Sequence, residues 1–137
     1  MNIAETANLL TAIQAFDNRK VDEVTIKNWH ALLEKHAFSD CYAAVTAHYT
    51  SSKGWIMPAD IVARVRDTEE ARLGTFQHGL RLREDDHDAL TGAVWGEAMR
   101  GLQHAARTGE LTPEAYDAYL SGRVQLSTTI RRKGIEA

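Results

Sequence analysis

Apolar residues recur along the chain at steps of three and four positions, which is the period of an amphipathic α-helix. From about residue 3 to residue 16, the expected inward-facing positions of a first helix are Ile3, Ala7, Leu10, Ile13 and Phe16. A second stripe is made by Ile26, Trp29, Leu32 and Leu33. The sequence contains no convincing strand alternation and no Asn-Gly hairpin signal. It therefore predicts an all-α protein.

Capping residues predict where several helices begin and end. Asp22 and Ser39 are good N-caps for the second and third helices. Pro58 suits the first position of a fourth helix, where its missing N–H is not needed. A long helix over about residues 88–107 should end at Gly109, and Thr112-Pro113 gives the clearest start signal for the helix that follows.

These helices divide the chain into two parts. Residues 1–73 are expected to form a small N-terminal four-helix bundle, and residues 88–130 a C-terminal helical hairpin. Residues 74–87 hold two glycines and a polar run and are interpreted as a linker, while residues 131–137 form a basic tail. A hairpin alone has little core to bury, so we expect it to dock on the bundle, to form a homodimer with a second copy, or to bind a partner protein.

The net charge and the composition of the chain exclude several classes of protein. The chain has 137 residues and a formal net charge of −3, so it lacks the positive field of a general nucleic-acid coat protein. It has one cysteine, which excludes an internal disulfide and a cysteine-rich zinc site. No apolar run reaches the roughly 18 residues of a membrane span, and the first residues do not have the pattern of a secretory signal. We therefore expect a cytoplasmic protein.

No motif of a known enzyme class is present. The sequence has no glycine-rich phosphate loop, no GxSxG nucleophile turn and no HExxH zinc motif. Cys41 lies on an apolar helix face, where a thiol is usually inert packing. The six histidines lack metal-ligand spacing. We therefore expect no catalytic residue, no metal ligand and no cofactor.

Two apolar stripes in the second half are the candidate partner-binding residues. Trp95, Met99 and Leu102 share one face of the long helix, and further apolar residues follow Thr112. Such stripes can form the core of the hairpin or the anchor of a protein interface, since aromatic residues dominate interface hot spots. The candidates are Trp95, Met99, Leu102, Tyr116, Tyr119 and Leu120.

A helix-turn-helix DNA-binding regulator is the alternative. The third and fourth helices are joined by a glycine-containing loop, and the fourth exposes Arg64, Arg66 and Arg72, as a recognition helix would. Acidic residues interrupt this basic face, and the acidic net charge works against the phosphate contacts that supply much of DNA affinity. Direct nucleic-acid binding is therefore expected to be weak or absent.

Four sequence elements of the first half occur in order along the chain. They are Phe16-Asp17-Asn18-Arg19, Trp29-His30, Ala44-Val45-x-x-His48-Tyr49 and Trp55-Ile56-Met57-Pro58-Ala59-Asp60-Ile61. In the order and spacing of these elements, the chain resembles phage replicative helicase loader/inhibitor proteins over about residues 6–73.

The resemblance implies a role in phage DNA replication without catalysis. In that family the N-terminal domain is a small helical bundle, and the more variable C-terminal segment engages a DnaB-type hexameric helicase. The family delivers the helicase to an origin marked by an initiator protein and restrains its ATPase. Inhibition of another host protein through the same hairpin is a further alternative.

Overall fold

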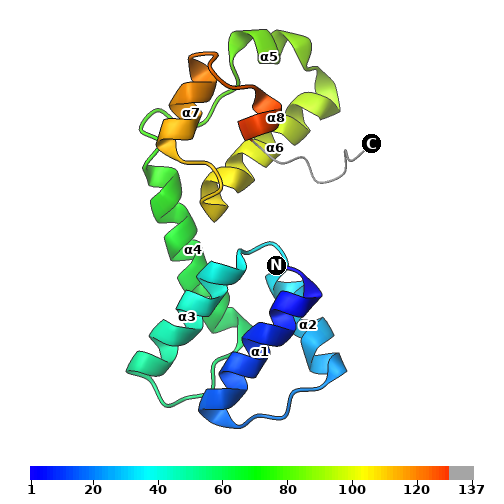
Figure 1. Ribbon diagram of the computed structural model, residues 1–137, viewed down its shortest axis with the longest axis vertical. Helices are drawn as coiled ribbons and strands as arrows, with labels where there is room; N and C mark the ends of the chain where they lie inside the picture. The colour runs from blue at the N-terminus through cyan, green and yellow to red at the C-terminus, as the bar shows by residue number, and fades with distance from the viewer. Residues whose placement is uncertain (130–137) are drawn as a thin grey trace. The chain divides into compact units, whose positions relative to one another are not determined.

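The computed structural model describes residues 1–129, which fold entirely into helices, turns and loops, as predicted. Figure 1 shows the element order. The helices are α1 (Ile3–Asp17), α2 (Glu23–Leu33), α3 (Phe38–Ser51), α4 (Pro58–Gly74), α5 (Glu84–Ala89), α6 (Gly92–Thr108), α7 (Pro113–Leu120) and α8 (Leu126–Thr129). The predicted basic tail and the last hairpin residue, Ile130, lie outside the described residues.

The chain divides into two compact units, Met1–Thr68 (unit 1) and Glu69–Ala137 (unit 2). Helix α4 begins in unit 1 and its last residues belong to unit 2. Each unit has its own cluster of buried apolar side chains. The boundaries predicted from sequence, with a linker at 74–87, stay predictions.

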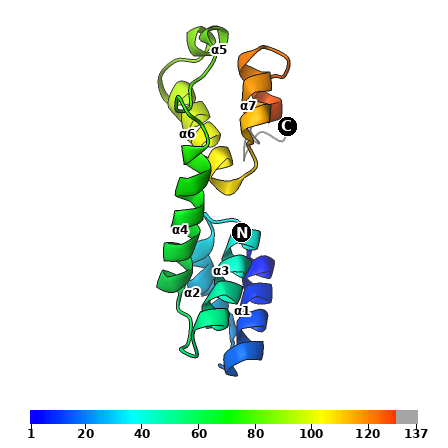
Figure 2. The ribbon, with the colours of Figure 1, turned by 90° about the vertical axis from the view of Figure 1, so that its left-hand side faces the viewer.

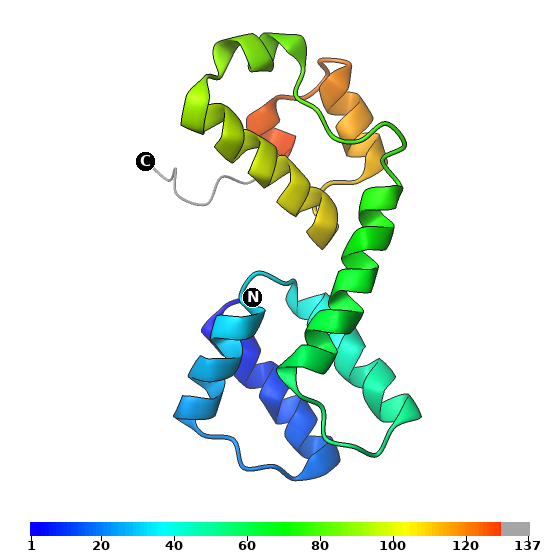
Figure 3. The same ribbon diagram turned by 180° about the vertical axis from the view of Figure 1, so that it is seen from behind.

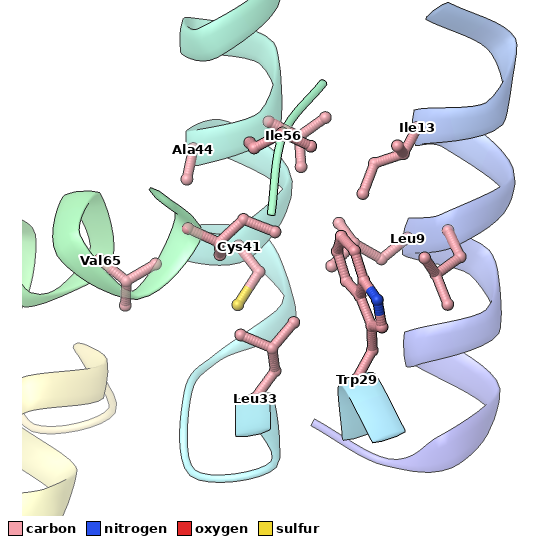
Figure 4. Packing of buried hydrophobic residues seen from close by; sticks show 11 residues of the cluster. Leu9, Ile13, Trp29, Leu33, Cys41, Ala44, Ile56 and Val65 are labelled. Carbon is pink, nitrogen blue, oxygen red and sulfur yellow. The ribbon is translucent and has the colours of Figure 1, made fainter. Parts of the chain in front are cut away.

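Unit 1 is built around α1, which packs against both α2 and α3, as the views in Figures 2 and 3 show. Buried side chains from α1 to α4 and from Ile56 in the α3–α4 loop meet in one core. Figure 4 shows Cys41 in the middle of this cluster, close to Leu33 and Trp29. Its side chain is fully buried, in agreement with the expectation that it is a packing residue.

Most predicted helix ends are confirmed. The Asp22 carboxylate accepts from the backbone N–H of Thr25, and the Thr112 hydroxyl accepts from that of Ala115. Gly109 ends α6 in the left-handed conformation. The prediction for Ser39 is wrong: the N-cap of α3 is Ala37, two residues earlier, so the helix begins at Phe38, and Ala37 makes no side-chain hydrogen bond. Packing of Phe38 against the unit-1 core takes the place of a polar cap there.

Unit 2 contains more than the expected hairpin. The long helix predicted for residues 88–107 is interrupted at Leu90 and Thr91, which separate the short α5 from α6. The segment before it contributes Phe76 and Leu82 to the unit-2 core, together with residues of α6, α7 and α8. Unit 2 therefore buries a core of its own, because the irregular segment covers an apolar face that two helices alone leave open.

Candidate partner-binding site

The predicted partner-binding residues come together in unit 2 but differ in exposure. Leu102, Tyr116 and Tyr119 are buried in the core between α6 and α7. Met99 and Leu120 are partly buried and pack against that core. Trp95 is 37% exposed, so of this set it offers the most side-chain surface to a partner.

Helix α6 exposes a small apolar surface made by Val94 and Trp95. Val94 is 46% exposed, and the Trp95 ring makes an edge contact with the His87 ring of α5, with 5.9 Å between centroids. The contact holds the indole against α5 while leaving part of it open to solvent. A partner could therefore bind here without unfolding unit 2.

The two tyrosines of α7 hold the segment before α5 in place. The Tyr116 hydroxyl accepts from the backbone N–H of Arg81 at 2.8 Å. The Tyr119 hydroxyl accepts from the N–H of Arg83 at 3.0 Å and donates to the Asp86 carboxylate at 2.6 Å. These side chains tie an irregular segment to a helix more than 30 residues further along the chain.

Arg83 completes this arrangement, and we call Arg83, Asp86 and Tyr119 the unit-2 clamp. The Arg83 guanidinium lies 5.2 Å from the centre of the Tyr119 ring and forms an ion pair with Asp86 at 3.5 Å. Burial and the hydrogen bond to Asp86 raise the pKa of Tyr119 to about 12. The phenol therefore stays protonated and keeps donating to Asp86 at neutral pH.

A pocket of about 380 Å³ lies between α7 and the loop that precedes Arg81. Its apolar walls include Phe76, Tyr116 and Leu120, and its exposed polar lining residues include Arg81 and Asp117. The rings of Phe76 and Tyr116 meet edge to face, with their centroids 5.6 Å apart. Sequence analysis could not find this pocket, because half of it belongs to the segment interpreted as a linker.

Unit 1 contains a second clamp, made by Asp17, Arg19 and Tyr49. Arg19 Nη2 lies 2.5 Å from Asp17 Oδ2, and both side chains are almost fully buried. The Tyr49 hydroxyl donates to the same carboxylate oxygen at 2.5 Å and accepts from the N–H of Ile56 at 3.2 Å. The unit-1 clamp therefore ties the end of α1 to α3 and to the α3–α4 loop.

The charges of the unit-1 clamp stabilise one another. Burial alone raises the pKa of Asp17, but hydrogen bonds from Arg19 and Tyr49 outweigh it and hold that pKa below 3.8. Burial lowers the pKa of the Arg19 guanidinium, and the carboxylate of Asp17 more than offsets this and raises it. Burial and the bond to Asp17 raise the pKa of Tyr49. At neutral pH the clamp is an ion pair with a protonated phenol.

Aromatic rings cover the unit-1 clamp, and two of them are exposed to solvent. The Arg19 guanidinium lies 5.4 Å from the Trp29 ring centre and 4.9 Å from that of Trp55. Trp29 is buried, whereas Trp55 is 60% exposed. Phe16 stacks on Tyr49 at 4.7 Å and is 58% exposed. We call Phe16 and Trp55 the aromatic surface of unit 1, which the sequence pattern did not predict. The exposure of Phe16 corrects its expected place on the inward face of the first helix.

The arginines of the DNA-binding alternative lie in different surroundings. Arg64 and Arg66 are exposed on α4. Arg72 is partly buried, and its Nη1 donates to the carbonyl of Arg107 near the C-terminal end of α6. A cation at this position also interacts favourably with the helix dipole. Arg72 is therefore engaged in the structure of unit 2, which leaves Arg64 and Arg66 as the exposed pair.

Within residues 1–129, no helix is both long enough and apolar enough to cross a membrane. In the same part of the chain, His, Cys, Asp and Glu side chains form no group of three or more that could hold a metal ion.

Comparison with known proteins adds one finding. Residues 1–59 match a family model that describes the N-terminal domain of a phage helicase loader/inhibitor. The match includes α1, α2, α3 and the loop up to the first turn of α4, and thus every residue of the unit-1 clamp and of the aromatic surface. No curated protein and no solved structure matches the chain.

Proposed function

We propose, from the premise that residues 1–59 match the N-terminal domain of the phage helicase loader/inhibitor family, that the protein binds a DnaB-type hexameric replicative helicase. It loads the helicase, inhibits its ATPase, or does both in sequence. The observation that carries the proposal is the family match, which falls on the residues that build and cover the unit-1 clamp.

We assign helicase binding to the C-terminal part of the chain, within residues 88–130. Trp95 is the exposed contact, Met99 and Leu120 are partly buried, and Leu102, Tyr116 and Tyr119 are buried in the core beneath them. Unit 2 lies outside the family match, so this assignment rests on its exposed apolar residues.

Unit 1 is then free to bind a second protein. A loader must also recognise the site where the helicase is needed, and a replication initiator is the partner we propose for this purpose. The aromatic surface of Phe16 and Trp55 suits that contact, because exposed aromatic side chains on a rigid base dominate many interfaces. These roles require no catalytic site, and we expect the protein to perform them in the cytoplasm of the bacterial host.

The first test is a pull-down of the purified replicative helicase with the full-length protein and with a truncation after residue 73. We expect the full-length protein to retain the helicase and to change its ATPase rate, and the truncation to do neither. Equal retention by both proteins contradicts the assignment to the C-terminal part. No retention by either contradicts the function.

The DNA-binding alternative is tested with the same protein. A shift of duplex DNA by the protein alone, weakening as salt is raised, is the signature of phosphate contacts. Loss of that shift on replacing Arg64 and Arg66 would favour the alternative. Absence of a shift together with a changed helicase ATPase favours the proposed function.

A further inference from the structure

The apolar surface of Val94 and Trp95 lies in the most acidic part of the chain. Residues 83–100 hold five carboxylate side chains and two arginines, which is a surplus of three negative charges. The whole protein has a formal net charge of −3, so the charges of all its other residues cancel. This stretch covers α5, the turn after it and the first half of α6. The net negative charge of the protein is therefore concentrated in the segment that exposes the Trp95 indole.

Three of these carboxylates are available to a binding partner. Glu84 and Asp85 are exposed in the first turn of α5, and Glu97 is exposed on α6. Glu97 follows Val94 by three positions, so the two side chains are neighbours on the surface of the helix. Within residues 1–129, none of the three carboxylates forms a salt bridge. Asp86, by contrast, is held in the unit-2 clamp and is not available.

The contact between the rings of His87 and Trp95 brings α5 beside this surface. Glu84 lies three positions before His87, which places the two residues on the same face of α5. Figure 1 shows how α5 joins the start of α6 through a short turn. Carboxylates of both helices therefore border the exposed indole, within the roughly 8–10 Å over which charges act at physiological salt.

One cation, Arg100, also reaches into this region. A Cβ added at Gly96 would lie 3.3 Å from Arg100 Nη1, so the guanidinium leans back along α6 to the residue next to Trp95. Arg100 offsets one of the carboxylates and leaves the surface acidic.

The sign of this charge selects among the possible occupants of the apolar surface. The phosphates of a nucleic acid and the headgroups of an anionic membrane are repelled by it. In a symmetric dimer, a second copy of the chain would bring an equally acidic surface against this one. A protein segment with lysine or arginine side chains is the complementary occupant.

We propose that Val94 and Trp95 bind an apolar side chain of the replicative helicase that is flanked by basic residues, which pair with Glu84, Asp85 and Glu97. The inference rests on the proposed function and makes it more specific, because it names the chemistry of the helicase segment. The indole supplies the anchor contact, since a few aromatic residues carry most of the energy of many interfaces. The carboxylates steer the segment to the indole and orient it there.

The test measures the affinity of the full-length protein for the purified DnaB-type helicase by titration calorimetry. Glu97→Lys reverses an exposed charge beside Val94 and should weaken binding by about tenfold, because like charges then face each other. Raising the salt concentration should weaken binding of the unaltered protein, and should weaken binding of Glu97→Lys less, because salt screens the charge pairs.

Two further variants separate this effect from misfolding and from the change in net charge. Glu110→Lys is the matched control, since Glu110 is exposed in unit 2 and the rise of α6, about 1.5 Å per residue, places it about 20 Å from Trp95. It should leave the affinity within about twofold of the original. Arg100→Glu removes the repelling cation and should strengthen binding by about threefold, a gain that a damaged fold does not produce.

The outcomes distinguish this inference from the function on which it rests. If the unaltered protein binds the helicase and Glu97→Lys weakens binding no more than Glu110→Lys, the basic segment is overturned while the function stands. An affinity of the unaltered protein that does not change with salt overturns it as well. A dimer in sedimentation that Trp95→Ala disperses would make a second copy the occupant and overturn the inference. If the unaltered protein does not bind the helicase, the proposed function fails, and the inference fails with it.

Discussion

The Tyr49 hydroxyl donates to Asp17 Oδ2 although the two residues lie 32 positions apart. The same oxygen of Tyr49 accepts from the backbone N–H of Ile56, which fixes the loop before α4. In unit 2, Tyr119 repeats this arrangement with Asp86 as acceptor and the N–H of Arg83 as donor. Each unit thus uses a tyrosine hydroxyl to hold an irregular segment, with an arginine beside the carboxylate.

Tyr49→Phe should destabilise unit 1 by about 2 kcal/mol, because it removes a hydrogen bond to an ionised acceptor and leaves the N–H of Ile56 without its partner. Tyr42→Phe is the matched control on the same helix, since Tyr42 is 49% exposed, and its effect should stay within about 0.5 kcal/mol. Hydrogen exchange of the α1 and α3 amides measures the loss of stability caused by each substitution. Equal effects of the two substitutions would contradict the role of the clamp.

The unit-1 clamp should make unit 1 sensitive to acid. The pKa of Asp17 is lowered in the folded state, so above its ordinary value of 3.8 the carboxylate is ionised in both states and the full stabilisation is present. Below about pH 4 the unfolded chain takes up the proton first, and the stabilisation is lost as pH falls through the folded pKa.

Urea unfolding of unit 1 at neutral pH and near pH 3 checks this expectation. Asp17→Asn should be less stable at neutral pH, by about 3 kcal/mol, since it breaks a buried ion pair. It should also lose less stability on acidification than the unaltered protein. The exposed Asp22, whose pKa is also lowered, remains in the variant, so part of the pH dependence of the unfolding free energy persists. If the unfolding free energy of Asp17→Asn depended on pH as strongly as that of the unaltered protein, Asp17 would not be the group responsible.

Tyr119 should titrate at unusually high pH. Its pKa is raised to about 12, so below pH 10 the phenol is protonated in both folded and unfolded states, and its contribution to stability is complete. As pH rises from 10 toward 12 the unfolded chain loses the proton first and unit 2 loses stability. Tyrosinate absorbance should show a late-titrating group that is absent in Tyr119→Phe. A titration unchanged by the substitution contradicts the assignment.

The end of α6 depends on a glycine. Gly109 has φ of +80°, and a Cβ there would lie 3.1 Å from Arg72 Nε. Gly109→Ala should therefore destabilise unit 2 by about 1 kcal/mol, the cost of a left-handed alanine, and displace the Arg72 side chain. Gly74→Ala is the control, because nothing lies within 4 Å of its added Cβ, and it should be neutral or stabilising. Thermal unfolding compares the two, and a greater loss for Gly74→Ala would contradict this account.

Local signals predicted much of the fold, and long-range contacts explain what they missed. The N-caps Asp22 and Thr112 could be predicted from the sequence, because each capping hydrogen bond joins residues only three positions apart. Arg19 is buried by its ion pair with the nearby Asp17 and by the ring of Trp55, which is 36 positions away in the chain. No local sequence pattern predicts the contact with Trp55. The start of α3 at Phe38 likewise follows from core packing and not from the hydroxyl of Ser39.

The candidate partner-binding site shows the same contrast between local sequence patterns, which could be predicted, and long-range contacts, which could not. Helical spacing placed Trp95 and Leu102 on one stripe of α6, but spacing does not tell which end of a stripe a neighbouring element covers. Leu102 is fully buried, while Trp95 is 37% exposed. The loop wall of the pocket comes from a polar segment whose two core residues, Phe76 and Leu82, have no helical period to mark them.

Trp95→Ala and Leu102→Ala should therefore separate binding from stability. Leu102→Ala creates a cavity in the unit-2 core and should cost about 3 kcal/mol of unfolding free energy. Trp95→Ala removes a partly exposed ring and should cost about 1 kcal/mol, yet weaken helicase binding by about tenfold. Thermal unfolding and the helicase titration, run on both variants, test this at a temperature where each remains folded. Unchanged affinity for Trp95→Ala would show that the indole only packs against α5, and the helicase contact would then have to lie elsewhere on unit 2.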